Sequence, residues 1–217
     1  MTTLNGSDRI KSNYKRSSGD SGKSLLFNGH SLPKNHPAAS IYSECESLAY
    51  AINKFLLKNE LKYTFLGNTL NWLKRNSFSL GAFVFSLGDS ERHSIPNEVM
   101  NQLEAAVLDL EYDPQIGSAV DFVVHNKELY VDLDGIRIII RKTEAAYTTW
   151  NQDWVVNEHL LKVAATNPEQ AQKIAIARQD YAAYLNRLSK FIWLATRQEA
   201  QISGDFETQH YWIGKIE

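Results

Sequence analysis

Apolar residues recur every three or four positions in several stretches of the chain, which is the spacing that places them on one face of an α-helix. The first such stretch begins at Ser43, and its apolar positions are Cys45, Leu48, Ala49, Ile52, Phe55 and Leu56. The run Ser43-Glu44-Cys45-Glu46 has the form of a capping box, which marks a helix N-terminus. The sequence therefore predicts a helix that starts at Ser43 and holds Cys45 in its first turn.

Three further helices follow from the same spacing and from residues that favour helix starts. Pro96 opens the first, Asp153 caps the second, and Asn167-Pro168 starts the third, because Asp and Asn are good N-caps and proline suits the first turn. The predicted helices cover residues 96–110, 153–165 and 168–201. Residues 61–76 give no single pattern, since Gly67-Asn68 interrupts them and a short helix over 70–75 is the alternative.

Two other segments are rich in β-branched and aromatic residues, which is typical of strands. Residues 81–87 are predicted as a buried strand. Residues 119–142 are predicted as antiparallel strands over 119–124, 129–133 and 136–140, with turns at Asn126-Lys127 and Asp134-Gly135. The predicted fold is α+β: a helical lobe and an antiparallel sheet of three to four strands, covered by a C-terminal helical pair.

Composition divides the chain into a tail and one domain. Residues 1–37 are rich in Ser, Asn, Gly and Lys and carry six Lys and Arg against two Asp, so a disordered basic tail is predicted there. Residues 38–217 are predicted as a single α+β domain, with a mainly helical part over 38–118, the sheet over 119–142 and C-terminal helices over 143–217.

Charge and hydropathy exclude several classes of protein. The net charge of -2 gives no global reason to expect nucleic acid as a partner. No apolar run approaches the length of a transmembrane helix, and the N-terminus lacks the apolar region of a signal peptide. One cysteine cannot form an intrachain disulfide. These features predict a cytoplasmic protein, or one delivered without a classical signal peptide.

Cys45 is the first candidate for chemistry. A thiol in the first turn of a helix is stabilised as a thiolate by free backbone N–H groups and the helix dipole. Glu44 and Glu46 oppose that effect by repulsion, so the direction of the pKa shift stays open. The alternative is that Cys45 is a small core residue on an apolar helix face.

The predicted hairpin over 119–142 supplies the other candidates. With a two-residue turn at Asn126-Lys127, Asp121 lies opposite Asp132, and His125 lies opposite Glu128 on the same face. Two carboxylates placed opposite each other need a cation between them, or one must take up a proton. That polar face is predicted to line a cleft.

Two patches resemble papain-like and transglutaminase-like cysteine hydrolases. Residues 44–51, ECESLAYA, resemble the helix that bears the nucleophile, and residues 130–135, YVDLDG, resemble the strand with the orienting acid. The resemblance implies Cys45 as nucleophile and Asp132 as the orienting group. The histidine expected in such enzymes is replaced by Asp121, so His125 or His93 would be the base, or the site is that of a pseudoenzyme.

No cofactor and no metal site are predicted. The six histidines are scattered, and a single cysteine excludes thiolate clusters. Gly22-Lys23-Ser24 matches the end of a phosphate-binding loop, but position 17 holds serine instead of the first glycine and no strand precedes the run. The sequence therefore gives no P-loop.

Two functions from different classes remain as hypotheses. The first is a cysteine hydrolase or acyltransferase, with Cys45, His125 and Asp132 as catalytic residues and a peptide as substrate. The alternative is a non-catalytic module that binds a protein partner through the aromatic-rich C-terminal helices. Nucleic-acid binding through the basic tail is a minor third hypothesis, and the oligomeric state is left open.

Overall fold

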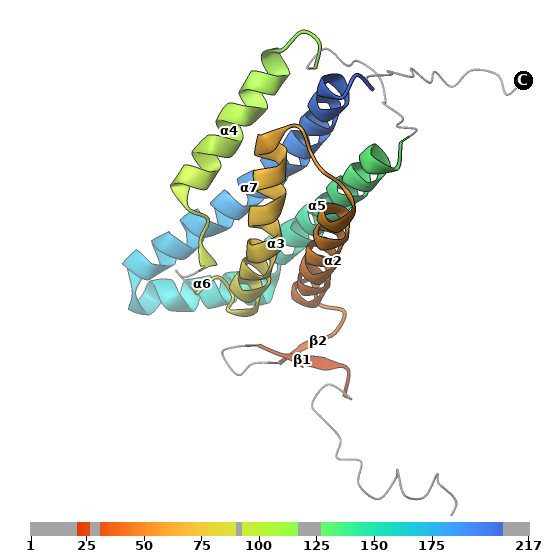
Figure 1. Ribbon diagram of the computed structural model, residues 1–217. Coiled ribbons are helices and arrows are strands. Elements are labelled where there is room, and N and C mark those ends of the chain that lie inside the picture. The colour runs from red at the N-terminus through yellow and green to blue at the C-terminus, as the bar shows by residue number, and fades with distance from the viewer. Residues whose placement is uncertain (1–20, 27–30, 90–92, 117–126, 206–217) are drawn as a thin grey trace, which may run out of the picture.

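The protein is mostly helical, with one small antiparallel sheet. A computed structural model describes residues 21–26, 31–89, 93–116 and 127–205. Within these ranges the chain forms β1 (Lys23–Leu25), β2 (Ser31–Pro33), α2 (Pro37–Lys58), α3 (Thr64–Phe85), α4 (Asn97–Tyr112), α5 (Glu128–Asn151), α6 (Trp154–Thr166) and α7 (Pro168–Ile202). The helices form a bundle, and the β1–β2 hairpin lies at one end of it (Figure 1).

One apolar core holds the bundle together. Helix α2 packs against α3 and α5, and the long helix α7 packs against α5, α4 and α6. The largest fully buried side chains come from several helices and include Phe55, Phe83, Tyr147, Trp150 and Phe191. Aromatic side chains of this size contribute most of the apolar area that such a core removes from water. The packing of α7 against α4, α5 and α6 agrees with its course along most of the bundle in Figure 1.

Helix α2 confirms the apolar stripe predicted from Cys45 onward but not the predicted start. It begins at Pro37, with His36 as the N-cap, and His36 Nδ1 accepts a hydrogen bond from the backbone of Ala38 at 3.2 Å. Ala38 and Ile41 extend the buried stripe towards the N-terminus. The capping box at Ser43 is therefore wrong, because proline at the first helical position and an apolar spacing that continues back to Ala38 set an earlier start.

Helix α3 replaces the predicted strand over 81–87 and continues through the Gly67-Asn68 break. A Cβ on Gly81 would lie 2.9 Å from the Tyr42 ring, so the glycine allows α2 and α3 to approach closely. The helix ends where Leu87 and Gly88 adopt positive φ values of 57° and 87°. The short aromatic run GAFVFSL was ambiguous because a buried helix segment and a buried strand have the same composition.

Helix α5 contradicts the predicted sheet over 128–142. Its buried residues recur every three or four positions, at Tyr130, Leu133, Ile136, Ile140, Thr143, Tyr147 and Trp150. This period is helical, and it continues for three turns beyond the segment that was interpreted as strands. The strands predicted at 129–133 and 136–140 are wrong, and the strand predicted at 119–124 lies outside the described residues.

The other three predicted helices are confirmed. Helix α4 begins directly after Pro96. The Asp153 carboxylate caps α6 by accepting from Val155 N at 2.8 Å. Asn167 caps α7 by accepting from Gln170 N at 3.1 Å. At the end of α7, Gly204 adopts a φ of 72°. Local capping chemistry was sufficient to place these three helix starts.

The β1–β2 hairpin lies within the segment predicted as a tail. Lys23 pairs with Pro33 and Leu25 with Ser31 in antiparallel register, and Lys34 N donates to Gly22 O at 2.8 Å. Leu26 and Leu32 are buried and belong to the same core as the helices. In the described ranges, no helix has the length and hydropathy needed to cross a membrane.

Candidate functional site

Cys45, the predicted nucleophile, lies in the interior of α2 and not at its N-terminus. Its side chain is buried. Burial raises the pKa of the Cys45 thiol to about 12 against the opposing effect of a backbone hydrogen bond with Gly81, and the charges of Glu44 and Glu46 make smaller upward contributions to that value. The thiol is therefore protonated near neutral pH, where nucleophilic attack requires a thiolate.

The structure does not assemble the other predicted catalytic residues around Cys45. Asp132 lies half-buried on α5, a helix and not a strand. The backbone carbonyl of His93 accepts a hydrogen bond from the Tyr181 hydroxyl. His125 and Asp121 lie outside the described residues. The catalytic roles of Cys45, His125 and Asp132 stay predictions that this geometry does not support.

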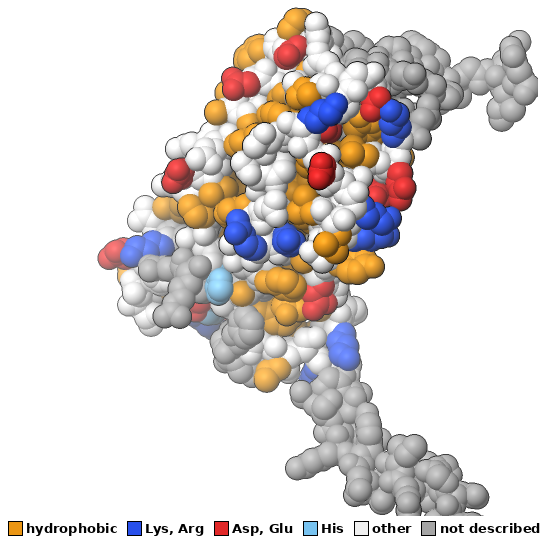
Figure 2. Space-filling view, in the orientation of Figure 1, with side chains coloured by type: hydrophobic (Ala, Val, Ile, Leu, Met, Phe, Trp, Pro, Cys, Tyr) orange, Lys and Arg blue, Asp and Glu red, His pale blue; other side chains and the backbone are white. Residues whose placement is uncertain are grey.

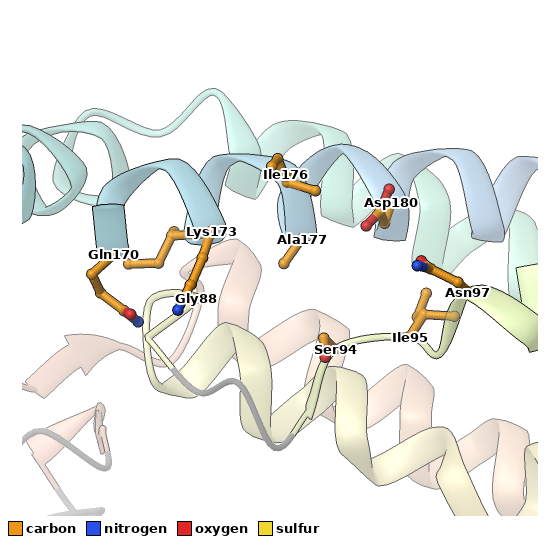
Figure 3. A pocket seen from close by; sticks show the side chains of 10 residues that line it. Gly88, Ser94, Ile95, Asn97, Gln170, Lys173, Ile176, Ala177 and Asp180 are labelled. Carbon is orange, nitrogen blue, oxygen red and sulfur yellow. The ribbon is translucent and has the colours of Figure 1, made fainter. Parts of the chain in front are cut away.

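One hollow in the described part of the surface has a volume of about 430 Å³. It lies between the N-terminal half of α7 and the segment that joins α3 to α4 (Figure 3). Helix α7 contributes Gln170, Lys173 and Asp180, and the Lys173 side chain extends towards Gly88. Lys173 also pairs with Glu169 at 3.2 Å. A hollow of this size with lysine, carboxylate and amide groups suits a small polar molecule.

Sequence analysis missed this hollow, although α7 carried a signal for it. Gln170, Lys173, Ala177 and Asp180 are spaced by three, four and three residues, so they share one face of the predicted helix. The other half of the hollow comes from Gly88, Ser94, Ile95 and Asn97, which follow the end of α3. Because that region was interpreted as a strand and a turn, the two halves could not be brought together.

Arg178 is a buried residue of α7 that lies close to Gly88, one of the residues that line the hollow. The guanidinium donates to the carbonyl oxygens of Val156 at 2.8 Å and Leu87 at 3.3 Å, and lies 5.4 Å from the Trp150 ring centroid. Burial lowers the pKa of the Arg178 guanidinium. These contacts hold the turn at Leu87 and Gly88 against α6 and α7.

The run Gly22-Lys23-Ser24 begins the β1–β2 hairpin, so β1 overlaps the run and is not a strand that precedes it. Gly22 has a φ of 73°, and Lys23 is exposed. Nothing lies within 4 Å of the position that a Cβ on Gly22 would take. The sequence conclusion that this is not a strand–loop–helix P-loop agrees with the described geometry, but the run is exposed and next to folded structure.

The remaining chemistry of the described residues is dispersed. No group of three or more His, Cys, Asp and Glu side chains is placed to hold a metal ion in the ranges that the structure describes. Figure 2 shows cationic and acidic side chains interspersed with apolar ones on one face of the bundle. Mixed charges of this kind produce no extended field of one sign on that face.

Comparisons with known proteins give one consistent result. A family model described as cobalamin adenosyltransferase matches residues 14–199. A variant of the PduO-type ATP:corrinoid adenosyltransferase from Lactobacillus reuteri, in complex with cobalamin and ATP, has a TM-score of 0.67 and 19% identity, covering 91% of this chain and 98% of its own. A second variant from the same organism, in complex with ATP, has a TM-score of 0.62 and 20% identity, covering 86% of this chain and 93% of its own. None of the curated proteins matches the chain.

These findings contradict the functional hypotheses drawn from the sequence. The resemblance to papain-like and transglutaminase-like hydrolases rested on two short patches, and one of them, residues 130–135, is helical in the structure. The family match instead covers most of the chain. The hydrolase, pseudoenzyme and non-catalytic interaction hypotheses are therefore wrong. The hydrolase hypothesis also depended on a sheet over residues 119–142, of which residues 128–142 are helical in the structure.

Proposed function

We propose that this chain, which belongs to the cobalamin adenosyltransferase family, transfers the adenosyl group of ATP to the cobalt of a corrinoid. The observation that carries the proposal is the family match over residues 14–199, which spans both strands and reaches the last turns of α7. The solved proteins with the same fold are named as ATP:corrinoid adenosyltransferases and hold ATP and cobalamin. The partners in this proposal are ATP and a corrinoid, not a protein or peptide.

The proposed reaction makes one bond and breaks one. Cobalt in the Co(I) state supplies the electron pair for a new cobalt–carbon bond to C5′ of the adenosyl group. The C5′–O bond to the triphosphate breaks, and the triphosphate leaves with that electron pair. The protein's part is to hold both substrates in line, to exclude water and to stabilise the charge on the leaving triphosphate.

The N-terminal segment is the part of the chain best suited to the triphosphate. Residues 1–37 carry six Lys and Arg against two Asp, whereas the remainder of the chain is acidic. The family match starts at residue 14, so the run Ser18-Gly19-Asp20-Ser21-Gly22-Lys23-Ser24 is part of the family domain and not an appended tail. Lysine side chains and the backbone N–H groups of glycine-rich turns are the usual ligands of phosphate.

Anaerobic transfer to a chemically reduced corrinoid tests the proposal. Purified protein, ATP and Co(I) corrinoid are expected to give the cobalt–carbon product, measured by its absorbance spectrum, with one triphosphate released per product. Lys23→Ala is expected to raise the KM for ATP about tenfold with a smaller change in the KM for the corrinoid, because a charge-assisted hydrogen bond is lost.

Lys173→Ala is the matched control, because Lys173 is also an exposed lysine but lies in the hollow of Figure 3. It is expected to leave the KM for ATP within about twofold. An effect of Lys173→Ala larger than that of Lys23→Ala would move the ATP site to the hollow. Absence of the alkylated corrinoid and of triphosphate with fully folded wild type would overturn the proposed function itself.

A further inference from the structure

We infer that a second cavity, enclosed by α2, α3, α5 and α7, is a binding site for a small neutral ring compound that carries one hydrogen-bonding group. Its volume is about 190 Å³. Cys45 lines it from α2, Ser77 from α3, Thr143 from α5, and Tyr181 and Leu185 from α7. The inference does not rest on the proposed adenosyl transfer, because none of these residues is given a part in that reaction.

Ser77 is the observation that points to a ligand. Its side chain is 6% exposed, yet its hydroxyl has no hydrogen-bond partner. The other buried Ser and Thr hydroxyls in the described ranges all donate to backbone carbonyls: Thr143 to Ile139, Ser189 to Asn186 and Thr196 to Ile192, at 2.7 to 3.0 Å. A buried hydroxyl normally has a partner, so this one is positioned for a group that enters the cavity.

Other polar residues of α3 make a hydrogen bond that was also available to Ser77. Along the same helix, Thr69 donates to Phe65 O at 2.9 Å, and Asn76 donates to Trp72 O at 2.8 Å. Ser and Thr in helices commonly turn back onto the carbonyl four residues earlier. Ser77 does not do so and lines the cavity instead.

The walls favour a neutral ring over an ion. Among the described residues that line the cavity there is no Asp, Glu, Lys or Arg. Trp72 and Tyr184, which both line it, meet edge to face with centroids 6.0 Å apart, and Leu48, Leu80 and Leu185 add aliphatic surface. The Cys45 thiol is protonated in this setting, since burial raises its pKa to about 12. Aromatic and aliphatic walls around one polar group are the usual composition of a small-molecule site.

The volume sets the size of the ligand. An apolar cavity of about 150 Å³ is sufficient for benzene. The cavity of about 190 Å³ therefore accommodates one six-membered ring with a small substituent. Ordered water is the competing occupant. A buried water needs two to four polar partners, and in this cavity Thr143, Tyr181 and Asn76 already donate to carbonyls of the chain itself.

Phenol and toluene are the probes, since they have the same shape and differ in one hydroxyl. Calorimetry and the shift in Tm at increasing probe concentration measure binding to the full-length protein. Wild type is expected to bind both and to prefer phenol by about tenfold, the effect of one hydrogen bond. Ser77→Ala is expected to remove this preference and retain toluene binding. Ser77→Leu, which fills the space, is expected to abolish binding of both.

Ser189→Ala is the matched control, because Ser189 is an equally buried serine whose hydroxyl is already bonded to Asn186 O. It is expected to lower the Tm of the unliganded protein and to leave probe binding unchanged. Ser77→Ala is expected to keep or raise that Tm, because it removes an unpaired hydroxyl. No binding of either probe to wild type, equal phenol affinity in wild type and Ser77→Ala, or a Tm loss in Ser77→Ala as large as in Ser189→Ala would overturn the inference.

Discussion

At the scale of single residues, two glycines in helices are expected to respond oppositely to the same substitution. Gly81→Ala places a Cβ 2.9 Å from the Tyr42 ring at the α2–α3 contact, whereas Gly135→Ala meets nothing within 4 Å. We expect Gly81→Ala to lower the free energy of unfolding by about 1 to 3 kcal/mol through overpacking. Gly135→Ala should raise it by roughly 0.5 to 1 kcal/mol through helix propensity. Urea denaturation measures both, and equal effects would contradict this packing.

Cys45 is expected to make stability depend on alkaline pH. The folded pKa of about 12 lies above the unfolded value of 9.0, so the thiol stabilises the fold fully below pH 9 and progressively loses that contribution up to about pH 12. Between pH 8 and pH 10.5, wild type should lose about 2 kcal/mol more than Cys45→Ala. If the free energies of unfolding of wild type and Cys45→Ala changed in parallel with pH, the Cys45 thiol would be accessible to solvent.

At the scale of secondary-structure elements, the sequence predicted helices with distinct start signals and failed where composition was ambiguous. Asp153 and Asn167-Pro168 place α6 and α7 because capping depends on a few neighbouring residues. In α5, Val131, Ile138 and Ile139 favour a strand, and Asp134-Gly135 favours a turn. Packing against α2 and α7 overrides these propensities. The period of the buried residues over all of 128–151 was the better signal.

Helix α3 depends on a carboxylate that no local pattern could reveal. Glu199 of α7 is 1% exposed and accepts hydrogen bonds from Lys62 N at 3.0 Å and Tyr63 N at 2.7 Å, at the start of α3. It therefore serves as an N-cap supplied from 136 residues further along the chain. Because this acceptor is distant in sequence, it added no local signal to residues 61–76, whose pattern Gly67-Asn68 interrupts.

Replacing the Glu199 carboxylate is expected to destabilise the start of α3. Glu199→Ala should lower the free energy of unfolding by about 2 to 4 kcal/mol, because two buried N–H groups lose a charged acceptor. Hydrogen exchange at the Lys62 and Tyr63 amides should become faster than elsewhere in α3. Glu158→Ala is the control: it removes an exposed ion pair with Lys162 and should cost less than about 1 kcal/mol. Unchanged exchange at both amides would contradict the cap.

At the scale of the whole molecule, the core and the proposed triphosphate site involve different parts of the chain. Residues 26 to 195 supply the core that holds the bundle together. The features that sequence analysis singled out for catalysis, Cys45 and Asp132, belong to helices of that bundle. The run around Gly22 and Lys23, which it set aside, lies within the family match and next to the β1–β2 hairpin. Core residues and site residues could not be separated without the three-dimensional arrangement.

Deletion of residues 1–20 tests whether the core and the proposed triphosphate site depend on different parts of the chain. The shortened protein should keep the Tm of the full chain within about 2 °C, because no residue of the core is removed. Its KM for ATP in adenosyl transfer should rise at least about tenfold, since most of the basic residues of the N-terminal segment are lost. Deletion of residues 206–217, which lie beyond the family match, should change neither quantity. Unaltered ATP kinetics after removal of 1–20 would contradict a contribution of these residues to triphosphate binding.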